Sequence, residues 1–160
     1  FTLDNVEKYL FDVAGIRVVC SYVDDIYMLA QALAKQDDIT VLKEKDYIKN
    51  PKPNGYRSYH MIVSVPVFFS DRTKNMAVEV QIRTIAMDFW ASLEHQLKYK
   101  QKVPNQQEIV RQLSDCAEQI ASVDKQMWQV RQQIELSEDI PTEEEILLEK
   151  LSRIDIAINE

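Results

Sequence analysis

The sequence has few of the residues from which several familiar functional sites are built. Its 160 residues include only two cysteines and two glycines. Because Cys20 and Cys116 lack metal-ligand spacing and a framework pattern, we expect reduced core thiols in a cytoplasmic protein. Glycines at positions 15 and 55 exclude both a Walker A loop and a Rossmann fingerprint. No apolar run approaches the roughly 20 residues that a membrane-spanning helix needs.

The chain is acidic, with a net charge of −7. Such a chain is a poor general binder of nucleic acid, so we expect no DNA partner and regard RNA as weakly supported. Basic residues nevertheless cluster in residues 43–60, which contain four lysines and one arginine but only two acidic residues. A local basic site on an acidic chain suits a small anion better than a long polyanion.

Hydrophobic spacing divides the chain into a mixed α/β core, about residues 1–103, and C-terminal helices over 104–160. Helices are expected over 2–11, from a cap at Asp24 to Lys35, and from a cap at Thr84 to about Lys100. Strands are expected over 16–20, 39–42, 59–67 and 76–83, with a loop over 49–57 and a turn over 70–75. This order predicts an α+β fold with a mixed β-sheet flanked by helices.

Apolar residues in the C-terminal part recur in steps of four and three, which predicts a long amphipathic helix. They are Ile109, Leu113, Cys116, Ile120, Val123, Met127, Val130 and Ile134. Pro141 interrupts the pattern, and a shorter helix over 147–158 completes an expected helical hairpin. The stripe invites a partner helix, which leaves two alternatives: self-association through these helices, or packing on the chain's own core or on the 147–158 helix.

The expected strand over 76–83 alternates apolar residues with Glu79, Gln81 and Arg83, so these three share one face. An ordinary half-buried strand would show the same pattern. The functional interpretation is a cleft in which Glu79 binds metal or acts as a base, while Gln81 and Arg83 contact substrate. Asp12, which alone would be a helix-end residue, then supplies a second carboxylate for Mg²⁺. Arg17 and the metal would neutralise charge on a transferring phosphoryl group.

The loop that leads to His60 is the most informative stretch of the chain. Two prolines stiffen it, and Gly55 permits a positive φ and a close backbone approach. Tyr56 offers a flat ring on which a base can stack. A lone strand histidine is usually structural, but His60 lies close enough to Tyr56 to be a candidate ligand. Anion-binding charge comes from Lys49, Lys52 and Arg57. Loop and strand together predict a nucleotide site for Mg²⁺-dependent phosphoryl or nucleotidyl transfer.

Four segments in this order resemble the synthetase domain of RelA/SpoT-type (p)ppGpp synthetases, and especially the small alarmone synthetases. They are residues 12–17, 45–48, 50–60 and 79–84. The resemblance covers about residues 1–103 and implies a nucleotidyltransferase-like core. It implies a GTP pyrophosphokinase, which transfers pyrophosphate from ATP to the 3′-hydroxyl of GTP or GDP and releases AMP. It also implies a homo-oligomer, commonly a tetramer, built through the C-terminal helices.

The resemblance implies roles for individual residues. Asp12 and Glu79 would bind Mg²⁺, with Glu79 also activating the 3′-hydroxyl. Arg17 and Lys45 would bind ATP. Tyr56 would stack on guanine. Beyond the resemblance, Asp88 on the helix after Thr84 is a candidate to accept hydrogen bonds from guanine N1 and N2, because adenine has no such donor pair. The full acceptor set is Lys45, Lys52, Asn54, Tyr56, Arg57, His60, Gln81 and Asp88.

The family's basic segment that clasps ATP precedes Asp12, and this chain begins too late to include it. Because Phe1 opens the sequence inside a helix-like stretch, we expect a fragment of a longer protein. Two other functions remain open. One is a catalytically silent module that binds a guanine nucleotide or single-stranded RNA, and the other is a nucleotidyltransferase with a different acceptor.

Overall fold

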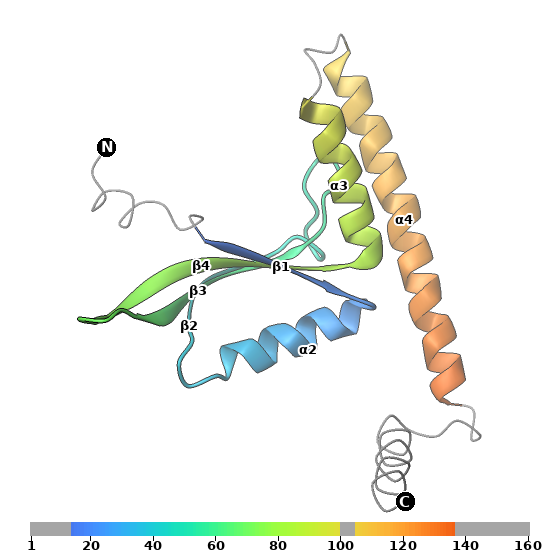
Figure 1. Cartoon of the computed structure of the whole chain (residues 1–160). Helices are drawn as coiled ribbons and strands as arrows, with labels where there is room; N and C mark the ends of the chain where they lie inside the picture. The colour runs from blue at the N-terminus through green and yellow to red at the C-terminus, as the bar shows by residue number, and fades with distance from the viewer. Residues whose placement is uncertain (1–13, 100–104, 137–160) are drawn as a thin grey trace, which may run out of the picture. The chain divides into compact units, whose positions relative to one another are not determined.

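The computed structural model describes residues 14–99 and 105–136, which form one four-stranded sheet and three helices (Figure 1). The strands are β1 (Gly15–Cys20), β2 (Thr40–Asp46), β3 (Tyr59–Phe68) and β4 (Thr73–Thr84). The helices are α2 (Val23–Ala34), α3 (Ile85–Tyr99) and α4 (Gln106–Glu135). The sheet order is β1-β4-β3-β2, with β1 parallel to β4 and the other pairs antiparallel. The expected α+β class with a mixed sheet is confirmed.

Several expected boundaries differ from those in the structure. α2 begins one residue before Asp24, and its N-cap is Tyr22, whose amide donates to the Asp25 carboxylate at 3.1 Å. β2 continues to Asp46 because it pairs with β3 over that length. The turn expected over 70–75 is shorter, because residues 73–75 pair with β3. The helices expected over 2–11 and 147–158, and Asp12, lie outside the described residues.

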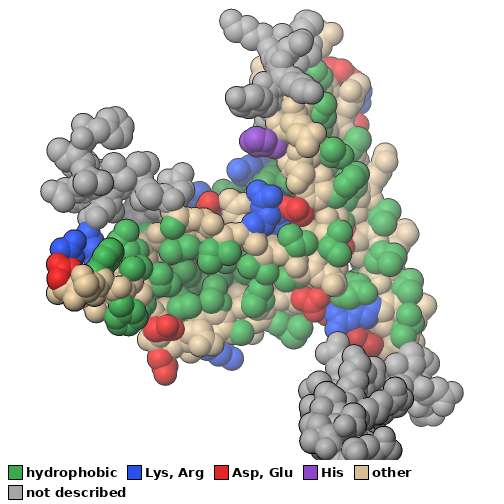
Figure 2. Space-filling view, in the orientation of Figure 1, with side chains coloured by type: hydrophobic (Ala, Val, Ile, Leu, Met, Phe, Trp, Pro, Cys, Tyr) green, Lys and Arg blue, Asp and Glu red, His purple; other side chains and the backbone are tan. Residues whose placement is uncertain are grey.

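The main core lies between the sheet and α2. Alternation along β3 and β4 sends Met61, Val63, Val80 and Ile82 to this face, each at most 4% exposed. Such burial is the main favourable term in folding. Hydrophobic side chains also reach the surface beside β1 and α2 (Figure 2), where Ile16 is 55% exposed. The same alternation turns the polar residues of β3 and β4 to the opposite face of the sheet.

A second hydrophobic cluster joins α3, α4 and the loop before β3. Its buried members are Trp90, Ala91 and Ala117, and the Trp90 indole donates to the Leu113 carbonyl at 3.0 Å. The buried face of α4 runs through Ala117, one position beyond Cys116 of the expected stripe. Cys116 is therefore exposed, and its expected place in the core is wrong, whereas Cys20 is half-buried.

The chain separates into two compact units, residues 1–127 and 128–160. In the first, Val123 and Met127 are 56% and 55% exposed, and in the second, Val130 and Ile134 are 47% and 49% exposed. The long C-terminal helix is confirmed, while self-association and a domain boundary at residue 103 stay predictions. No helix in the ranges that the structure covers is long and apolar enough to cross a bilayer.

Thr84 joins β4 to α3 and links both to α4. Its hydroxyl oxygen accepts the Met87 amide at 3.1 Å, which confirms the expected cap, and its hydroxyl donates to Asp124 of α4 at 2.6 Å. Thr84 and Asp124 are only 0% and 7% exposed. Burial raises the pKa of the Asp124 carboxyl, and the hydrogen bond from Thr84 partly opposes this shift.

Replacing Asp124 separates its charge from its hydrogen bond. Asp124→Asn keeps an acceptor for Thr84 and removes a buried charge, so its Tm at neutral pH should equal or exceed that of the unaltered protein. Asp124→Ala leaves the Thr84 hydroxyl unpaired and should cost about 1–3 kcal/mol of unfolding free energy. The measurement is thermal denaturation of both variants.

The pH dependence provides a second check. The folded pKa of Asp124 lies above its unfolded value, so this group favours the folded state increasingly as pH falls through the folded pKa. That gain, followed as pH falls from neutrality toward the ordinary pKa of an aspartate, should disappear in Asp124→Asn. If Asp124→Asn and Asp124→Ala lower the unfolding free energy equally, the buried charge of Asp124 does not have the role assigned to it.

Candidate active site

The strand register aligns one polar residue from each strand across the open face of the sheet. Lys45 of β2 pairs with His60 of β3, His60 pairs with Gln81 of β4, and Gln81 pairs with Arg17 of β1. Glu79, two residues before Gln81, shares this face. Residues from distant parts of the sequence meet here because β4 lies between β1 and β3.

Five polar side chains on this face form a closed series of hydrogen bonds, which we name the Arg83 ring. The Arg83 guanidinium donates to the Tyr56 hydroxyl and to Gln81 Oε1, both at 2.8 Å. The Tyr56 hydroxyl lies 2.8 Å from His60 Nε2, and His60 Nδ1 lies 3.1 Å from Glu79 Oε1. Gln81 Nε2 closes the ring by donating to Glu79 Oε2 at 2.9 Å.

A neutral His60 is compatible with every hydrogen bond of the ring. Its Nδ1–H donates to Glu79, and its Nε2 accepts the hydroxyl proton of Tyr56, whose oxygen accepts from Arg83. Burial lowers the pKa of His60, while the Glu79 carboxylate acts in the opposite direction and the nearby Arg83 adds to the lowering. The net shift favours the neutral imidazole that the hydrogen bonds require.

His60 should therefore titrate below the pKa of a free histidine. Because the unfolded chain then takes up the proton more readily, the contribution of His60 to stability is lost as pH falls from the unfolded pKa through the folded one. NMR titration of the two histidines tests this, and His60→Gln identifies the signal by removing it. A His60 midpoint above the free value would show that Glu79 outweighs burial.

Arg83 is the most buried charged residue of the ring, at 5% exposed. Its charge is matched by Asp88 of α3 at 3.1 Å, and Arg17 approaches the same carboxylate oxygen at 3.4 Å. A buried cation needs such partners because its desolvation is costly. Strand alternation had placed Arg83 on the polar face, but the family resemblance gave it no role. Its burial and its central place depend on α3, which the strand pattern does not reveal.

An open pocket of about 340 Å³ lies beside Tyr56, between the two arginines and α3. The α3 residues that line it are Ala91, Ser92, Glu94, His95 and Gln96. The Lys52 ammonium lies 4.7 Å from the centroid of the Tyr56 ring, and the Arg83 guanidinium lies 5.2 Å from it. An aromatic ring surrounded by cations suits an anionic ligand that carries a planar group. Stacking of guanine on Tyr56 stays a prediction.

Local hydrogen bonds fold the loop between β2 and β3. Asp46 Oδ1 accepts the amides of Ile48 and Lys49, both at 2.9 Å. A tight turn follows, in which the Gly55 amide donates to the Lys52 carbonyl at 2.8 Å. The Asn54 side chain donates to Glu94 of α3 at 3.0 Å. Asn54 therefore ties the loop to α3, and its expected contact with the acceptor stays a prediction.

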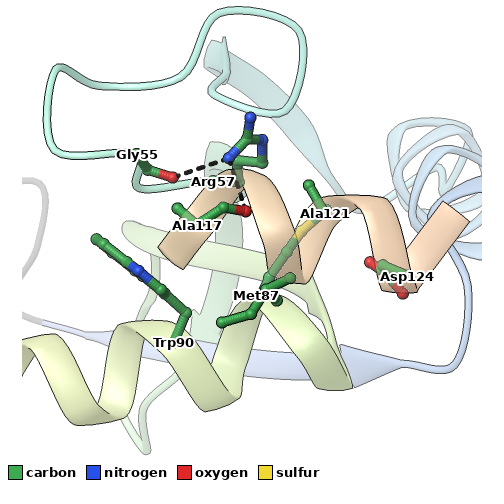
Figure 3. Close-up of a pocket in the computed structure, with 8 residues that line it drawn as sticks. Gly55, Arg57, Met87, Trp90, Ala117, Ala121 and Asp124 are labelled. Carbon is green, nitrogen blue, oxygen red and sulfur yellow. Dashed lines mark hydrogen bonds between the residues drawn. The ribbon is translucent and has the colours of Figure 1, made fainter. Parts of the chain in front are cut away.

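Gly55 and Arg57 turn toward α4 (Figure 3). Gly55 has φ of +87°, and a Cβ there would lie 2.4 Å from the Ala117 Cβ. Arg57 donates to the carbonyls of Gly55 and Ala117 at 3.2 and 3.4 Å, and to Glu118 at 2.7 Å. The structure therefore does not bring Arg57 into the Arg83 ring, and its role as an acceptor ligand stays a prediction.

Gly55→Ala should destabilise the fold by about 2–4 kcal/mol, since it combines a left-handed backbone with a steric overlap. Gly15→Ala is the matched control, because among the described residues a Cβ at Gly15 meets only the Glu79 carbonyl oxygen, at 3.8 Å. Chemical denaturation of both variants measures the difference. Similar losses in the two variants would show that the contact with Ala117 is not what requires glycine at position 55.

The part of the site that the structure describes suits one half of a magnesium centre. In residues 14–99 and 105–136, no three His, Cys, Asp or Glu side chains converge as a metal cage. The Glu79 side chain is 26% exposed, and within the described residues each of its oxygens accepts one hydrogen bond, which leaves further lone pairs. With His60 neutral, neither His60 nor Gln81 balances its charge, which suits a hard divalent cation.

Comparison with known proteins identifies the family. A family model that describes a region found in RelA and SpoT proteins matches residues 3–104 of this chain. The chain belongs to the RelA/SpoT family. Two RelA/SpoT relatives from Bacillus subtilis strain 168 are the GTP pyrophosphokinases YwaC and YjbM. YwaC is 40% identical over 134 residues, which are 84% of this chain and 64% of the relative. YjbM is 38% identical over 124 residues, which are 78% of this chain and 59% of the relative.

The chain thus spans about three fifths of the length of these curated relatives. Among solved structures, it is similar to small alarmone synthetase 1 from Bacillus subtilis bound to its product pppGpp. The TM-score is 0.76 at 37% identity, over 84% of this chain and 68% of the other. The family resemblance drawn from four short segments is confirmed.

Proposed function

We propose that this chain is the catalytic part of a GTP pyrophosphokinase that makes (p)ppGpp for the stringent response. In this reaction the 3′-oxygen of GTP or GDP bonds to the β-phosphorus of ATP. The bond between that phosphorus and the oxygen that bridges it to the α-phosphorus breaks, and AMP leaves with that oxygen. The observation that carries the proposal is the Arg83 ring, which fixes Glu79 beside Tyr56 and His60.

Glu79 is suited to act as the base. Its two oxygens are oriented by His60 and Gln81, while free lone pairs can accept the proton of the 3′-hydroxyl. Phosphoryl transfer depends more on positioning and charge neutralisation than on covalent chemistry. A carboxylate held from both sides supplies that positioning.

Cations from the outer strands would serve the two nucleotides. Arg17 of β1 and Lys45 of β2 lie three strand spacings apart, about 14 Å. We therefore assign Arg17 to the phosphates of ATP. Of the two roles expected for Lys45, this spacing favours contact with the acceptor.

The acceptor base would enter the pocket beside Tyr56. Asp88 lies near, and both Arg83 and Arg17 contact its Oδ1, so guanine N1 and N2 would share this carboxylate with the two arginines. His60 and Lys52 flank the ring of Tyr56 and would meet the ribose or phosphates.

Glu79 and Asp12 would hold Mg²⁺, and Asp12 lies outside the described residues. The ion would neutralise charge on the transferring group. The exposed positions of α4 would support a homo-oligomer, and we propose a tetramer in the cytoplasm, as the family resemblance implies.

Glu79→Gln tests the proposal. The amide keeps the shape of the side chain but loses its charge and its basicity, so AMP release should fall by about a hundredfold or more. The assay gives labelled ATP and GTP to the full-length protein and separates a guanosine 3′-diphosphate product by chromatography.

Glu44→Gln is the matched control, because Glu44 lies on β2 next to Lys45 and bonds Tyr59 at 3.1 Å rather than the ring. Its activity should stay near that of the unaltered protein. Full activity in Glu79→Gln would remove the catalytic role. If the unaltered protein binds nucleotide but forms no product, the catalytically silent module is favoured. If the unaltered protein forms a different labelled product, that product identifies another acceptor.

A further inference from the structure

The two residues next to Tyr56 in the sequence both contact α4. Before it, Gly55 lies so close to the helix that a Cβ would come 2.4 Å from the Ala117 Cβ and 3.1 Å from the Ser114 Cα. After it, Arg57 donates to the carbonyl of Ala117 and to the carboxylate of Glu118. The backbone that carries Tyr56 is thus held on both sides by one turn of α4 (Figure 3).

Arg57 joins the loop to the helix through a mostly buried guanidinium. Its side chain is 12% exposed, and it bonds the Gly55 carbonyl of the loop as well as the two groups on α4. The 2.7 Å contact with Glu118 is the shortest of these and joins opposite charges. Charge-assisted bonds of this length are stronger than neutral ones. Loss of Glu118 would leave Arg57 bonded to carbonyls alone.

We propose that Glu118 and Ala117 of α4 are positioning residues for the acceptor site. Through Arg57 and Gly55 they hold the loop in the conformation that places the Tyr56 hydroxyl against His60 and Arg83. This inference rests on the proposed function for the identity of the acceptor. It makes α4, which lies beyond the region that the family model matches, a part of the nucleotide site.

Glu118 is suitable for mutation because it is 67% exposed, so its replacement should leave folding intact. In Glu118→Lys, the new cation would repel Arg57 and should weaken GTP binding by about tenfold. ATP binding should change by less than about twofold, since Arg17 lies on β1 and pairs with Asp88 of α3 rather than with the loop. Equilibrium dialysis of the full-length protein with labelled GTP, and separately with labelled ATP, measures both affinities without turnover.

Two further variants separate positioning from general effects. Asp115→Lys makes the same charge change three residues earlier on α4, at an exposed position, and should leave both affinities unchanged. Glu118→Gln keeps an acceptor oxygen and should recover most of the GTP affinity. The KM for the guanine nucleotide should rise in Glu118→Lys with little change in kcat.

The outcomes distinguish this inference from the proposed function. Equal losses for GTP and ATP, an equal loss in Asp115→Lys, or unchanged GTP binding in Glu118→Lys would overturn the inference. Selective loss of GTP binding in a protein that forms no 3′-diphosphate product would support the positioning role and reject the proposed reaction. A protein that binds no GTP at all would reject both.

Discussion

The buried guanidinium of Arg83 is the interaction on which the polar face depends. With 5% of the residue exposed, its charge must be met inside the protein, and four hydrogen bonds meet it. Their acceptors come from three places: the loop before β3 through Tyr56 and Ser58, β4 through Gln81, and α3 through Asp88. Loop, sheet and helix are therefore fixed to one another at one cation, and the residues expected to bind the acceptor cannot move independently.

The distribution of charge around that cation suits a transfer between two anions. Arg83 and Arg17 share Asp88, so one positive charge remains uncompensated within this triplet. Glu79 instead carries an uncompensated negative charge, because its partners Gln81 and His60 are both neutral when burial keeps His60 unprotonated. A site with fixed positive groups beside an unbalanced carboxylate can receive phosphates on one side and a divalent cation on the other. Such preorganised charge contributes most of the stabilisation in reactions of this kind.

Local sequence predicted the parts of the site better than their arrangement. Alternation in β4 placed Glu79, Gln81 and Arg83 on one face, and the loop was recognised from its prolines and Gly55. The neighbours of β4 depend on long-range pairing, which no local pattern encodes. The basic loop predicts Arg57 as an anion ligand, yet two of its three hydrogen-bond acceptors lie on a helix about sixty residues later in the chain. The heptad stripe likewise predicted α4 but not that its buried face runs through Ala117.

The contacts between the loop and α4 order the loop before an acceptor binds. A loop that is ordered before binding spares the ligand part of the entropic cost of ordering it. Of the two cations beside the Tyr56 ring, Arg83 is buried and held by four hydrogen bonds, whereas Lys52 is exposed. The pocket that would receive the base is lined by Tyr56 and Arg83 and not by Lys52, so an incoming base would meet a fixed Arg83. The exposed Lys52 would turn toward the phosphates of the same nucleotide, so that stacking on Tyr56 and phosphate binding by Lys52 would occur together.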